Sequence, residues 1–287
     1  MSSQSSPSTA VLVTGCSSGI GRATALHLAQ RGHTVYASAR RPESIADLEA
    51  SGCRLLALDV TDEASMADAV RAVQGEHGAV GALVNNAGYS QSGAVESVPM
   101  DEVRRQFETN VFGLVRMCQL VLPAMRAQRS GRIVNVSSMG ANFTFPGGGY
   151  YHATKYAVEA ISDALRFEVK GFGVRVSIIQ PGLIRTNFGE AAATAVGQAE
   201  AEGPYGGFNA AVAKGTQDVY TKGAARHLGG PPEAVAKAIE RAITSKSPRI
   251  RYRVTPSARV LIGQRALMTD GMWDRFVGTQ FPRPGAE

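Results

Sequence analysis

Short apolar runs alternate with longer stretches of helical periodicity along most of this chain. The apolar runs that we expect to form strands are 10–14, 34–39, 54–59, 82–85, 131–137, 174–180 and 249–254. The stretches that we expect to form helices are 20–31, 43–50, 62–74, 100–128, 151–170 and 232–244. Such an alternation is typical of a parallel sheet whose strands are joined by crossover helices. We therefore predict an α/β fold with one doubly wound sheet of about seven parallel strands and helices on both faces.

The chain is long enough for one large hydrophobic core. It has 287 residues, of which 44% are apolar, and no low-complexity linker divides it, so we expect a single domain over 10–287. Residues 1–9 are polar and Ser-rich, which predicts a disordered tail and neither a secretory signal nor a membrane anchor. Residues 189–230 are rich in Ala and Gly and lack a core pattern, so we expect a mobile lid or substrate loop there. Residues 256–287 form a C-terminal extension that we expect to pack on the same domain.

Charge and cysteine content exclude several classes of function. The formal charge is +6, but Lys and Arg are scattered along the chain, which indicates no nucleic-acid partner. No run approaches the eighteen apolar residues of a spanning helix, so we expect no integral membrane segment. The three cysteines are Cys16, Cys53 and Cys118. Their odd number and the lack of CxxC spacing predict neither a disulfide framework nor a metal site, and a cytoplasmic location fits best.

A glycine-rich turn follows the first predicted strand. The sequence "AVLVTGCSSGIGRATA" places Gly15, Gly19 and Gly21 between that strand and the next helix. The N-terminus of a helix offers unpaired N–H groups and a partial positive charge, so a phosphate can bind there if no side chain blocks it. The spacing differs from the general GxGxxG fingerprint. Tight strand-to-helix turns also need glycine for steric reasons alone, so the turn by itself leaves both readings open.

Three further polar motifs lie at the carboxyl ends of predicted strands or just beyond them. They are "LVNNAG" at 83–88, "SS" at 137–138 and "YYHATK" at 150–155. Open parallel sheets bind their ligands at this edge, so we expect these motifs to meet at one crevice. Tyr151 and Lys155 are four residues apart, which places them on one face of a helix.

This pair predicts a proton-transfer site. An ammonium beside a phenol stabilises the phenolate and lowers the pKa of Tyr151 from about 10 toward physiological pH. The hydroxyl of Ser138 can hydrogen-bond a substrate oxygen near that phenol. Either feature alone is more often a surface pair or a helix cap, but their ordered combination favours catalysis.

Neighbouring residues fit these roles less well. Tyr150 lies about 100° around the helix from Tyr151, so only Tyr151 shares a face with Lys155. His152 also points away from Lys155, so we do not expect it to act as a general base. We expect Ser137 to be structural.

From about residue 10 to the last predicted strand, the sequence resembles the short-chain dehydrogenases/reductases. "TGCSSGIG" at 14–21 resembles the family's TGxxxGIG turn, and "NNAG" at 85–88 and "YHATK" at 151–155 resemble two further motifs. Ser138 lies thirteen residues before Tyr151, as in the family, and Asn110 in "ETNVFG" matches its helix asparagine. The resemblance implies a Rossmann-type sheet and a catalytic tetrad of Asn110, Ser138, Tyr151 and Lys155.

The resemblance also assigns a role to each member of the tetrad. Tyr151 is the acid–base group, and Ser138 orients the carbonyl. Lys155 additionally binds the nicotinamide ribose, and Asn110 holds a water molecule that links Lys155 to solvent. No metal is implied.

Cofactor-binding residues are implied by the same resemblance. The glycine turn supplies Gly15, Ser17, Ser18, Gly19, Ile20 and Gly21, and the tetrad supplies Tyr151 and Lys155. Asp59 and Val60 resemble the pair that receives the adenine. The remaining residues are Asn86, Ala87 and Gly88 of the NNAG motif, and Pro181, Gly182, Ile184 and Thr186 of "QPGLIRTNF", which contact the nicotinamide end.

The end of the second predicted strand indicates which cofactor is used. An acidic residue there would bind the ribose 2′-hydroxyl of NAD. Here Ala39 stands at that place and is followed by Arg40 and Arg41. A guanidinium suits a phosphate, so we predict NADP(H), with Arg40 as the main contact to the 2′-phosphate and Arg41 as the weaker one. The alternative is a pair of solvated arginines in a loop.

We therefore expect an NADP(H)-dependent alcohol dehydrogenase or ketoreductase. The sequence looks most like the branch with hydroxysteroid and retinol dehydrogenases and their bacterial relatives, which implies a small to medium hydrophobic ketone or alcohol. The aromatic residues Phe143, Phe145, Phe188 and Tyr205 either line the crevice or belong to the core. Alternative functions are a carrier-protein-linked 3-oxoacyl reductase and a non-catalytic NADPH-binding sensor. The long helices 100–128 and 151–170 predict a homodimer or homotetramer.

Overall fold

A parallel sheet forms the centre of the protein. The computed structural model describes residues 6–186, 188–197, 203–221 and 228–285. The strands are β1 (Val11–Val13), β2 (Val35–Ala39), β3 (Arg54–Ala57), β4 (Ala82–Asn85), β5 (Gly131–Val136), β6 (Val174–Pro181) and β7 (Arg251–Val254). They lie in the order β3-β2-β1-β4-β5-β6-β7, and every pair is parallel. The predicted doubly wound α/β sheet is confirmed.

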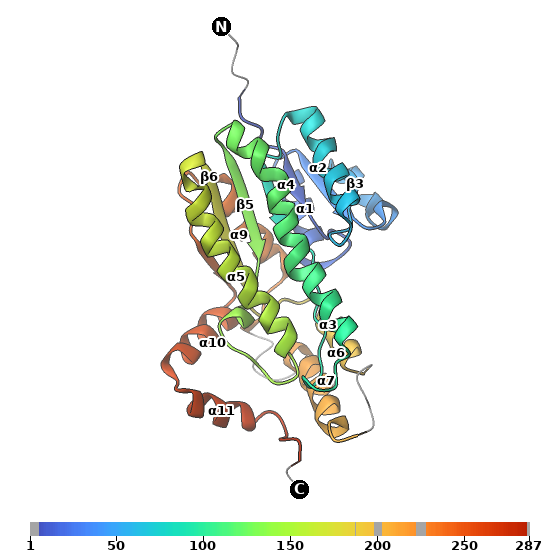
Figure 1. Ribbon diagram of the computed structural model, residues 1–287, viewed down its shortest axis with the longest axis vertical. Helices are drawn as coiled ribbons and strands as arrows, with labels where there is room; N and C mark the ends of the chain where they lie inside the picture. Colours follow the sequence, from blue (N-terminus) through green and yellow to red (C-terminus); the bar gives the residue numbers. More distant parts are fainter. Residues whose placement is uncertain (1–5, 187, 198–202, 222–227, 286–287) are drawn as a thin grey trace.

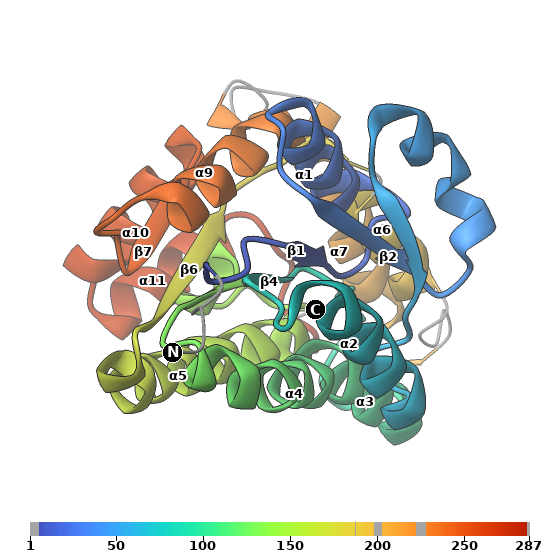
Figure 2. The same ribbon diagram turned by 90° about the horizontal axis from the view of Figure 1, so that it is seen from above.

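Helices cover both faces of this sheet (Figure 2). One face carries α1 (Gly19–Gln30) and α9 (Pro232–Thr244), and the other carries α2 (Glu63–His77), α4 (Gly113–Ala127) and α5 (Gly149–Val169). The inner strands β1, β2, β4, β5 and β6 are therefore mostly buried on both sides, which explains apolar runs such as AVLV at 10–13, whereas the edge strands β3 and β7 are partly exposed. In β1, Val11 and Val13 pack toward α1 and α9, while Leu12 packs on the opposite face.

The remaining helices gather at the carboxyl ends of the strands. Figure 1 shows the β5 arrow pointing toward the end of the molecule where α6 (Phe188–Gly197), α7 (Gly206–Thr221), α10 (Pro256–Leu267) and α11 (Asp270–Gly278) lie. The C-terminal extension packs there on its own domain, because Ala258, Ile262 and Trp273 share one buried cluster with Phe143. These helices build a layer above the edge where the site motifs end.

Two predicted helices take different forms. The stretch 43–50 is a kinked 3₁₀ segment, η1 (Pro42–Ser51). The stretch 100–128 is divided into α3 (Met100–Phe107) and α4 by a π-helical turn, η2 (Glu108–Phe112). Such turns recur at functional sites, and this one contains Asn110.

Where the structure describes the segment 189–230, much of it is helical and not irregular loop, because α6 and α7 occupy it. Its role as a mobile lid or substrate loop stays a prediction. The physical reason is the composition. Alanine has the highest helix propensity, so an Ala-rich segment forms helix even without a clear core pattern. Residues 198–202 and 222–227 lie outside the described residues.

The predicted N-terminal tail is partly attached to the domain. The backbone N–H of Ser8 donates to Oε1 of Gln128 over 2.9 Å. Residues 1–5 lie outside the described residues. Two short segments complete the fold: η3 (Met139–Ala141) follows β5, and η4 (Lys170–Phe172) follows α5.

In the described ranges, no helix is long and apolar enough to cross a membrane, and no group of His, Cys, Asp and Glu side chains could hold a metal ion. Cys16, Cys53 and Cys118 are buried free thiols. Burial raises the pKa of Cys16 and of Cys118 to about 12, so these two thiols stay protonated.

Candidate active site

The glycine turn packs tightly against the NNAG motif at the N-terminus of α1. Gly15 has a φ of +72°, and a β-carbon there would lie 2.9 Å from the Cα of Ala87. A β-carbon at Gly21 would overlap the carbonyl oxygen of Gly15. The capping residue Ser18 makes no side-chain cap bond, and the first turn of α1 carries no acidic residue. The backbone N–H groups of this turn therefore suit a phosphate.

The NNAG motif is fastened to this turn by hydrogen bonds. Oγ1 of Thr14 accepts from the backbone N–H groups of Asn86 and Ala87, each over 3.0 Å. Nδ2 of Asn86 donates to the carbonyl oxygens of Thr14 and Gly15 over 2.9 and 3.1 Å. Two motifs about seventy residues apart thus form one rigid edge. Sequence reasoning missed the role of Thr14, although a threonine at the end of an apolar strand is a signal for a buried hydroxyl contact.

Tyr151 and Lys155 share one face of α5, as predicted. Nζ of Lys155 lies 5.7 Å from the centroid of the Tyr151 ring. The Lys155 side chain is buried, with 7% of the residue exposed, and its Nζ donates to the carbonyl oxygen of Val136 over 3.0 Å. The end of β5 therefore fixes the ammonium beside the phenol ring.

Burial and a nearby carboxylate shift the pKa of Lys155 in opposite directions. Burial lowers the pKa of Lys155 to about 8, and the carboxylate of Glu159 opposes that change. Glu159 lies one helical turn further along α5. Its carboxylate accepts from Nε2 of Gln180 over 3.0 Å and from Nε of Arg251 over 2.8 Å. Sequence reasoning missed Glu159, because its partners come from β6 and β7.

Asn110 lies in the π turn and joins three elements of the site. Its Nδ2 donates to the carbonyl oxygen of Tyr89 over 2.9 Å and to Oγ1 of Thr154 over 3.1 Å. Its Oδ1 accepts from the N–H of Tyr89. A β-carbon at Gly88 would lie 3.0 Å from Oδ1 of Asn110 and 3.8 Å from Nζ of Lys155. The structure thus places Gly88 between the two expected catalytic residues.

Ser138 caps the short segment η3. Its Oγ accepts from the N–H of Gly140 over 3.0 Å, which leaves the hydroxyl hydrogen for donation to a substrate. Ser137 is buried, and its Oγ has no partner among the described residues. The hydroxyl of Tyr150 donates to the carbonyl oxygen of Val95 over 2.9 Å. Tyr150 is thereby held away from the role expected for its neighbour.

His152 is a structural residue. Its Nδ1 lies 2.7 Å from the carbonyl oxygen of Gly140, and its Nε2 accepts from the N–H of Phe145 over 3.3 Å. This arrangement requires the neutral tautomer with the proton on Nδ1. Burial lowers the pKa of His152, which favours that neutral form. Both ring nitrogens are engaged with the backbone of the segment after β5, so neither is available as a general base.

The segment after β6 approaches the glycine turn. A β-carbon at Gly19 would lie 3.3 Å from Cγ2 of Thr186. Ile184 is buried and pairs with Gly230 in a short parallel bridge. The space beside Gly182 is filled by the side chain of Ser257, so this glycine is required by packing. Thr186 is the member of this group that the structure brings directly to the expected phosphate site.

The expected adenine and 2′-phosphate residues lie at the ends of β2 and β3. Arg40 and Arg41 are exposed after β2, and no carboxylate among the described residues pairs with Arg40. Oδ1 of Asp59 accepts from the N–H and Oγ1 of Thr61 over 2.9 and 2.8 Å, which fixes the carboxylate locally. Val60 is buried. This end of the sheet therefore presents free guanidinium groups.

The four aromatic residues divide between core and crevice. Phe143 is buried and packs against Trp273, with ring centroids 5.4 Å apart. Phe145 stacks on Trp273 at 5.7 Å. Phe188 lies beside Tyr151, with ring centroids 5.6 Å apart. Tyr205 donates its hydroxyl to the carboxylate of Glu96 over 2.7 Å.

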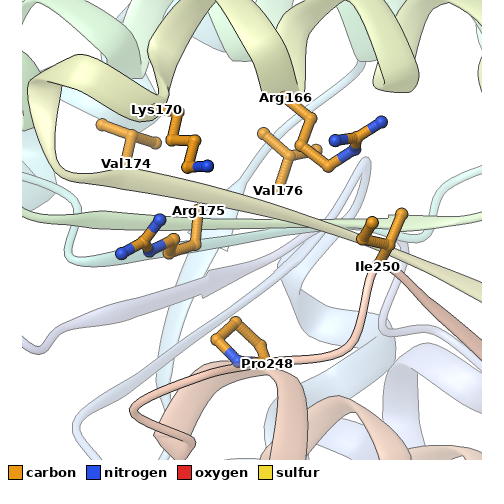
Figure 3. Close-up of a pocket in the computed structure, with 7 residues that line it drawn as sticks. All are labelled: Arg166, Lys170, Val174, Arg175, Val176, Pro248 and Ile250. Atoms are coloured by element: carbon orange, nitrogen blue, oxygen red, sulfur yellow. The ribbon is translucent and has the colours of Figure 1, made fainter.

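A small cavity of about 150 Å³ lies elsewhere, at the first residues of β6. Arg166, Lys170 and Arg175 contribute to its lining. Figure 3 shows the guanidinium groups of Arg166 and Arg175 pointing away from each other, so the cations do not converge on one ligand. It lies at the end of β6 opposite the candidate active site and forms no part of it.

Comparisons with known proteins agree with this geometry. The family model for short chain dehydrogenases matches residues 9–196. The chain is 35% identical to a 3-ketodihydrosphingosine reductase from Bacteroides thetaiotaomicron, covering 91% of this chain and 94% of the relative. It is 34% identical to an NADPH-dependent 3-dehydrocapnine reductase from Ornithobacterium rhinotracheale, covering 92% and 94%.

A solved structure of a short-chain dehydrogenase is also similar to this chain in sequence and fold. The short-chain dehydrogenase from Streptomyces avermitilis is 35% identical, covers 96% of each chain, and superposes with a TM-score of 0.78. The fold, the four motifs at the carboxyl edge and these matches lead to one conclusion. This chain belongs to the short-chain dehydrogenase/reductase family.

Proposed function

We propose that this protein is an NADP(H)-dependent ketoreductase and alcohol dehydrogenase that acts on hydrophobic substrates. The observation that carries the proposal is the buried Lys155 ammonium, fixed 5.7 Å from the Tyr151 ring centroid at the carboxyl edge of the sheet. The N-terminus of α1, where Ser18 makes no side-chain cap bond and the first turn has no acidic residue, suits the pyrophosphate of a dinucleotide. Gly88 of the NNAG motif lies directly against Asn110 and near Nζ of Lys155, which joins this motif to the expected tetrad.

The chain's own residues supply the proton chemistry. A bound nicotinamide supplies the hydride for the carbonyl carbon. Tyr151 gives its phenolic proton to the carbonyl oxygen, and the hydroxyl of Ser138 donates a hydrogen bond to the same oxygen. The ammonium of Lys155 stabilises the phenolate that remains on Tyr151. Asn110 holds the π turn against Tyr89 and Thr154 and lies near the Lys155 ammonium on the other side of Gly88.

The preference for NADP(H) rests on Arg40. Its guanidinium is exposed after β2 and has no carboxylate partner among the described residues, so it is free to bind a 2′-phosphate. The name of the NADPH-dependent relative from Ornithobacterium rhinotracheale supports the same choice. A charged hydrogen bond of this kind contributes about 1.5–3 kcal/mol.

Substituting Arg40→Asp should therefore lower kcat/KM with NADPH relative to NADH by about tenfold to hundredfold. The measurement is the ratio of the two kcat/KM values for one ketone, with Arg41→Asp as the matched control. We expect the control to change this ratio less. An unchanged ratio in the Arg40→Asp protein would remove the assignment.

The reaction itself is tested with a panel of ketones and alcohols, including steroids, retinoids and acyl thioesters, followed by the absorbance of NADPH at pH 7. We expect turnover of hydrophobic ketones. Activity confined to carrier-protein thioesters would favour the 3-oxoacyl reductase, although the C-terminal helices that extend the chain beyond β7 disfavour it. Tight NADPH binding without turnover of any substrate would indicate the sensor, but all four tetrad positions are retained here.

We also propose that the protein forms a homodimer or homotetramer through α4 and α5. The exposed side chains of Tyr156 and Phe167 lie on α5, Phe112 is exposed in η2 directly before α4, and Phe167 is 82% exposed. Large apolar side chains on neighbouring helices suit pairing with a symmetry mate. Sedimentation should show a dimer or larger, and Phe167→Glu should shift it toward the monomer. A monomeric wild-type protein would contradict this assembly.

Three buried free thiols suit a reducing compartment, so we propose a cytoplasmic location.

A further inference from the structure

An open cavity of about 660 Å³ lies between α7, the end of α11 and two loops of the domain. This volume falls within the range of about 300–1,000 Å³ that small-molecule sites occupy. Apolar side chains contribute much of its lining, including Ala94, Phe208, Val277 and Phe281. The first three are buried in the domain, and Phe281 packs against two buried clusters, one around Phe143 and Trp273 and one around Ala94 and Phe208. No catalytic step described above uses this cavity.

Two segments that line the cavity also carry motifs of the candidate active site. Ala94 follows the NNAG turn, and Pro146 and Gly147 belong to the segment that joins Ser138 to Tyr151. The ring of Phe145, next to Pro146, lies 6.1 Å from Phe281 and 6.5 Å from His152, measured between centroids. His152 is the direct neighbour of Tyr151. The rings of Tyr151 and His152 lie 5.8 Å apart, so a series of aromatic contacts leads from Tyr151 to the cavity wall at Phe281.

The polar residues of the cavity lie at its rim. Glu96, Asp274 and Arg283 are exposed and line the opening, where their charges stay in water. Tyr205 is held at the rim by its bond to Glu96. The buried part of the cavity presents hydrocarbon, so it gains free energy from burying methylene groups and offers no ion pair to a charged ligand.

We propose that this cavity binds the straight hydrocarbon chain of the substrate, so that the preferred substrates are ketones and alcohols with a long unbranched alkyl chain. The inference rests on the proposed function and adds to it the substrate class. The C-terminal segment contributes Val277, Gly278 and Phe281 to the cavity, so it is the part of the chain that selects for chain length.

The single tryptophan of the chain reports on this cavity. Trp273 lies in α11, stacks on Phe145 and precedes a rim residue, Asp274. Its fluorescence is followed while straight-chain 2-alkanones of four to fourteen carbons are added to the protein saturated with NADP⁺, which prevents turnover. Each buried methylene contributes about 0.8 kcal/mol, so we expect Kd to fall by up to about fourfold per added methylene until the cavity is full. A Kd that does not change with chain length would overturn the proposal.

Two glycines of α11 give a matched pair of variants. A β-carbon at Gly278 would face the flexible guanidinium of Arg283 at the cavity wall, so Gly278→Phe adds a ring there without a backbone clash. Gly271 lies in the same helix with nothing within 4 Å of its β-carbon position. We expect Gly278→Phe to raise Kd for the longest ketone at least tenfold and to leave Kd for butanone unchanged. Gly271→Phe should change neither, and equal effects of the two substitutions would contradict the proposal.

The variant Phe281→Ser provides a second test of the cavity, and Phe281 is not a member of the tetrad. It removes apolar wall, so the gain in affinity per methylene should become smaller than in the wild type. A rigid steroid ketone that binds as tightly as the linear ketone of similar carbon number would also count against the proposal. These outcomes are independent of turnover. Chain-length dependence without any reduction of ketones by NADPH would overturn the proposed function and leave the binding site standing.

Discussion

Replacing Tyr151 with phenylalanine should lower kcat for ketone reduction by about 10³-fold, while Kd for NADPH changes by less than about threefold. General acid catalysis contributes about 10²–10⁴-fold, and phenylalanine keeps the ring while it removes the proton donor. The ring contacts with Phe188 and Lys155 are retained, so the pocket keeps its shape. Single-turnover oxidation of NADPH and a separate binding titration measure the two effects.

Tyr150→Phe is the matched control for this substitution. It removes the same atom from the neighbouring residue, whose hydroxyl bonds the carbonyl oxygen of Val95. The control should keep activity within about threefold of the wild type, because no step of the reaction uses that hydroxyl. A Tyr151→Phe protein that keeps most of its activity would exclude Tyr151 as the proton donor.

Replacing Lys155 with methionine should lower kcat by about a hundredfold. The substitution keeps the length of the side chain and removes the charge that stabilises the Tyr151 phenolate. Because burial lowers the pKa of Lys155 to about 8, we expect kcat/KM of the wild type to fall as the pH rises through about 8. The pH profile of the Lys155→Met protein should lack this step. An identical step in both proteins would show that another group titrates there.

The same lysine should leave a signature in protein stability. The pKa of Lys155 in the folded protein is about 8, below its ordinary value of 10.5, so the unfolded chain binds more protons between these two pH values. The free energy of unfolding of the wild type should therefore rise with pH across this window, by about 3 kcal/mol in total from Lys155. Denaturant unfolding at pH 7 and pH 10 measures this rise, and it should be absent from the Lys155→Met protein. A wild type whose stability changes no more than that of the variant would contradict the burial of a charged Lys155.

The inner part of the sheet could be predicted because its strands are mostly buried on both faces. The run AVLV at 10–13 reads as continuous apolar sequence, and β1 (Val11–Val13) lies within it. Motif spacing predicted the Tyr151–Lys155 pair, since residues four apart share one face of a helix. These features depend on local sequence, so sequence patterns are sufficient to predict them.

The rest depends on contacts between distant segments. The π turn in the predicted helix 100–128 arises where Asn110 bonds Tyr89 and Thr154, and no periodicity shows those partners. Glu159 reads as an ordinary helix residue until Gln180 and Arg251 are placed against it. The helices α6 and α7 were expected to be a loop, because alanine contributes to helix propensity without marking a hydrophobic face.

The catalytic residues and the proposed substrate-binding cavity lie in different parts of the fold. The tetrad positions lie in η2, at the start of η3 and in α5, beside the carboxyl edge of the sheet, whereas α7 and residues after Trp273 line the open 660 Å³ cavity. Substrate selection in such a fold depends on the side chains of the site and not on the fold itself. We therefore expect changes in α11 to alter chain-length preference and to leave the proton chemistry at Tyr151 intact.

The central claim is that the Tyr151 hydroxyl works beside the nicotinamide ring, and a crystal structure of the protein with NADP⁺ bound tests it most directly. We expect the hydroxyl on the reactive face of the ring, positioned so that one carbonyl group reaches C4 of the ring and lies within about 2.6–3.2 Å of the hydroxyl. Lys155 should contact the ribose in the same structure. A hydroxyl turned away from the ring, with another side chain facing C4, would contradict the claim.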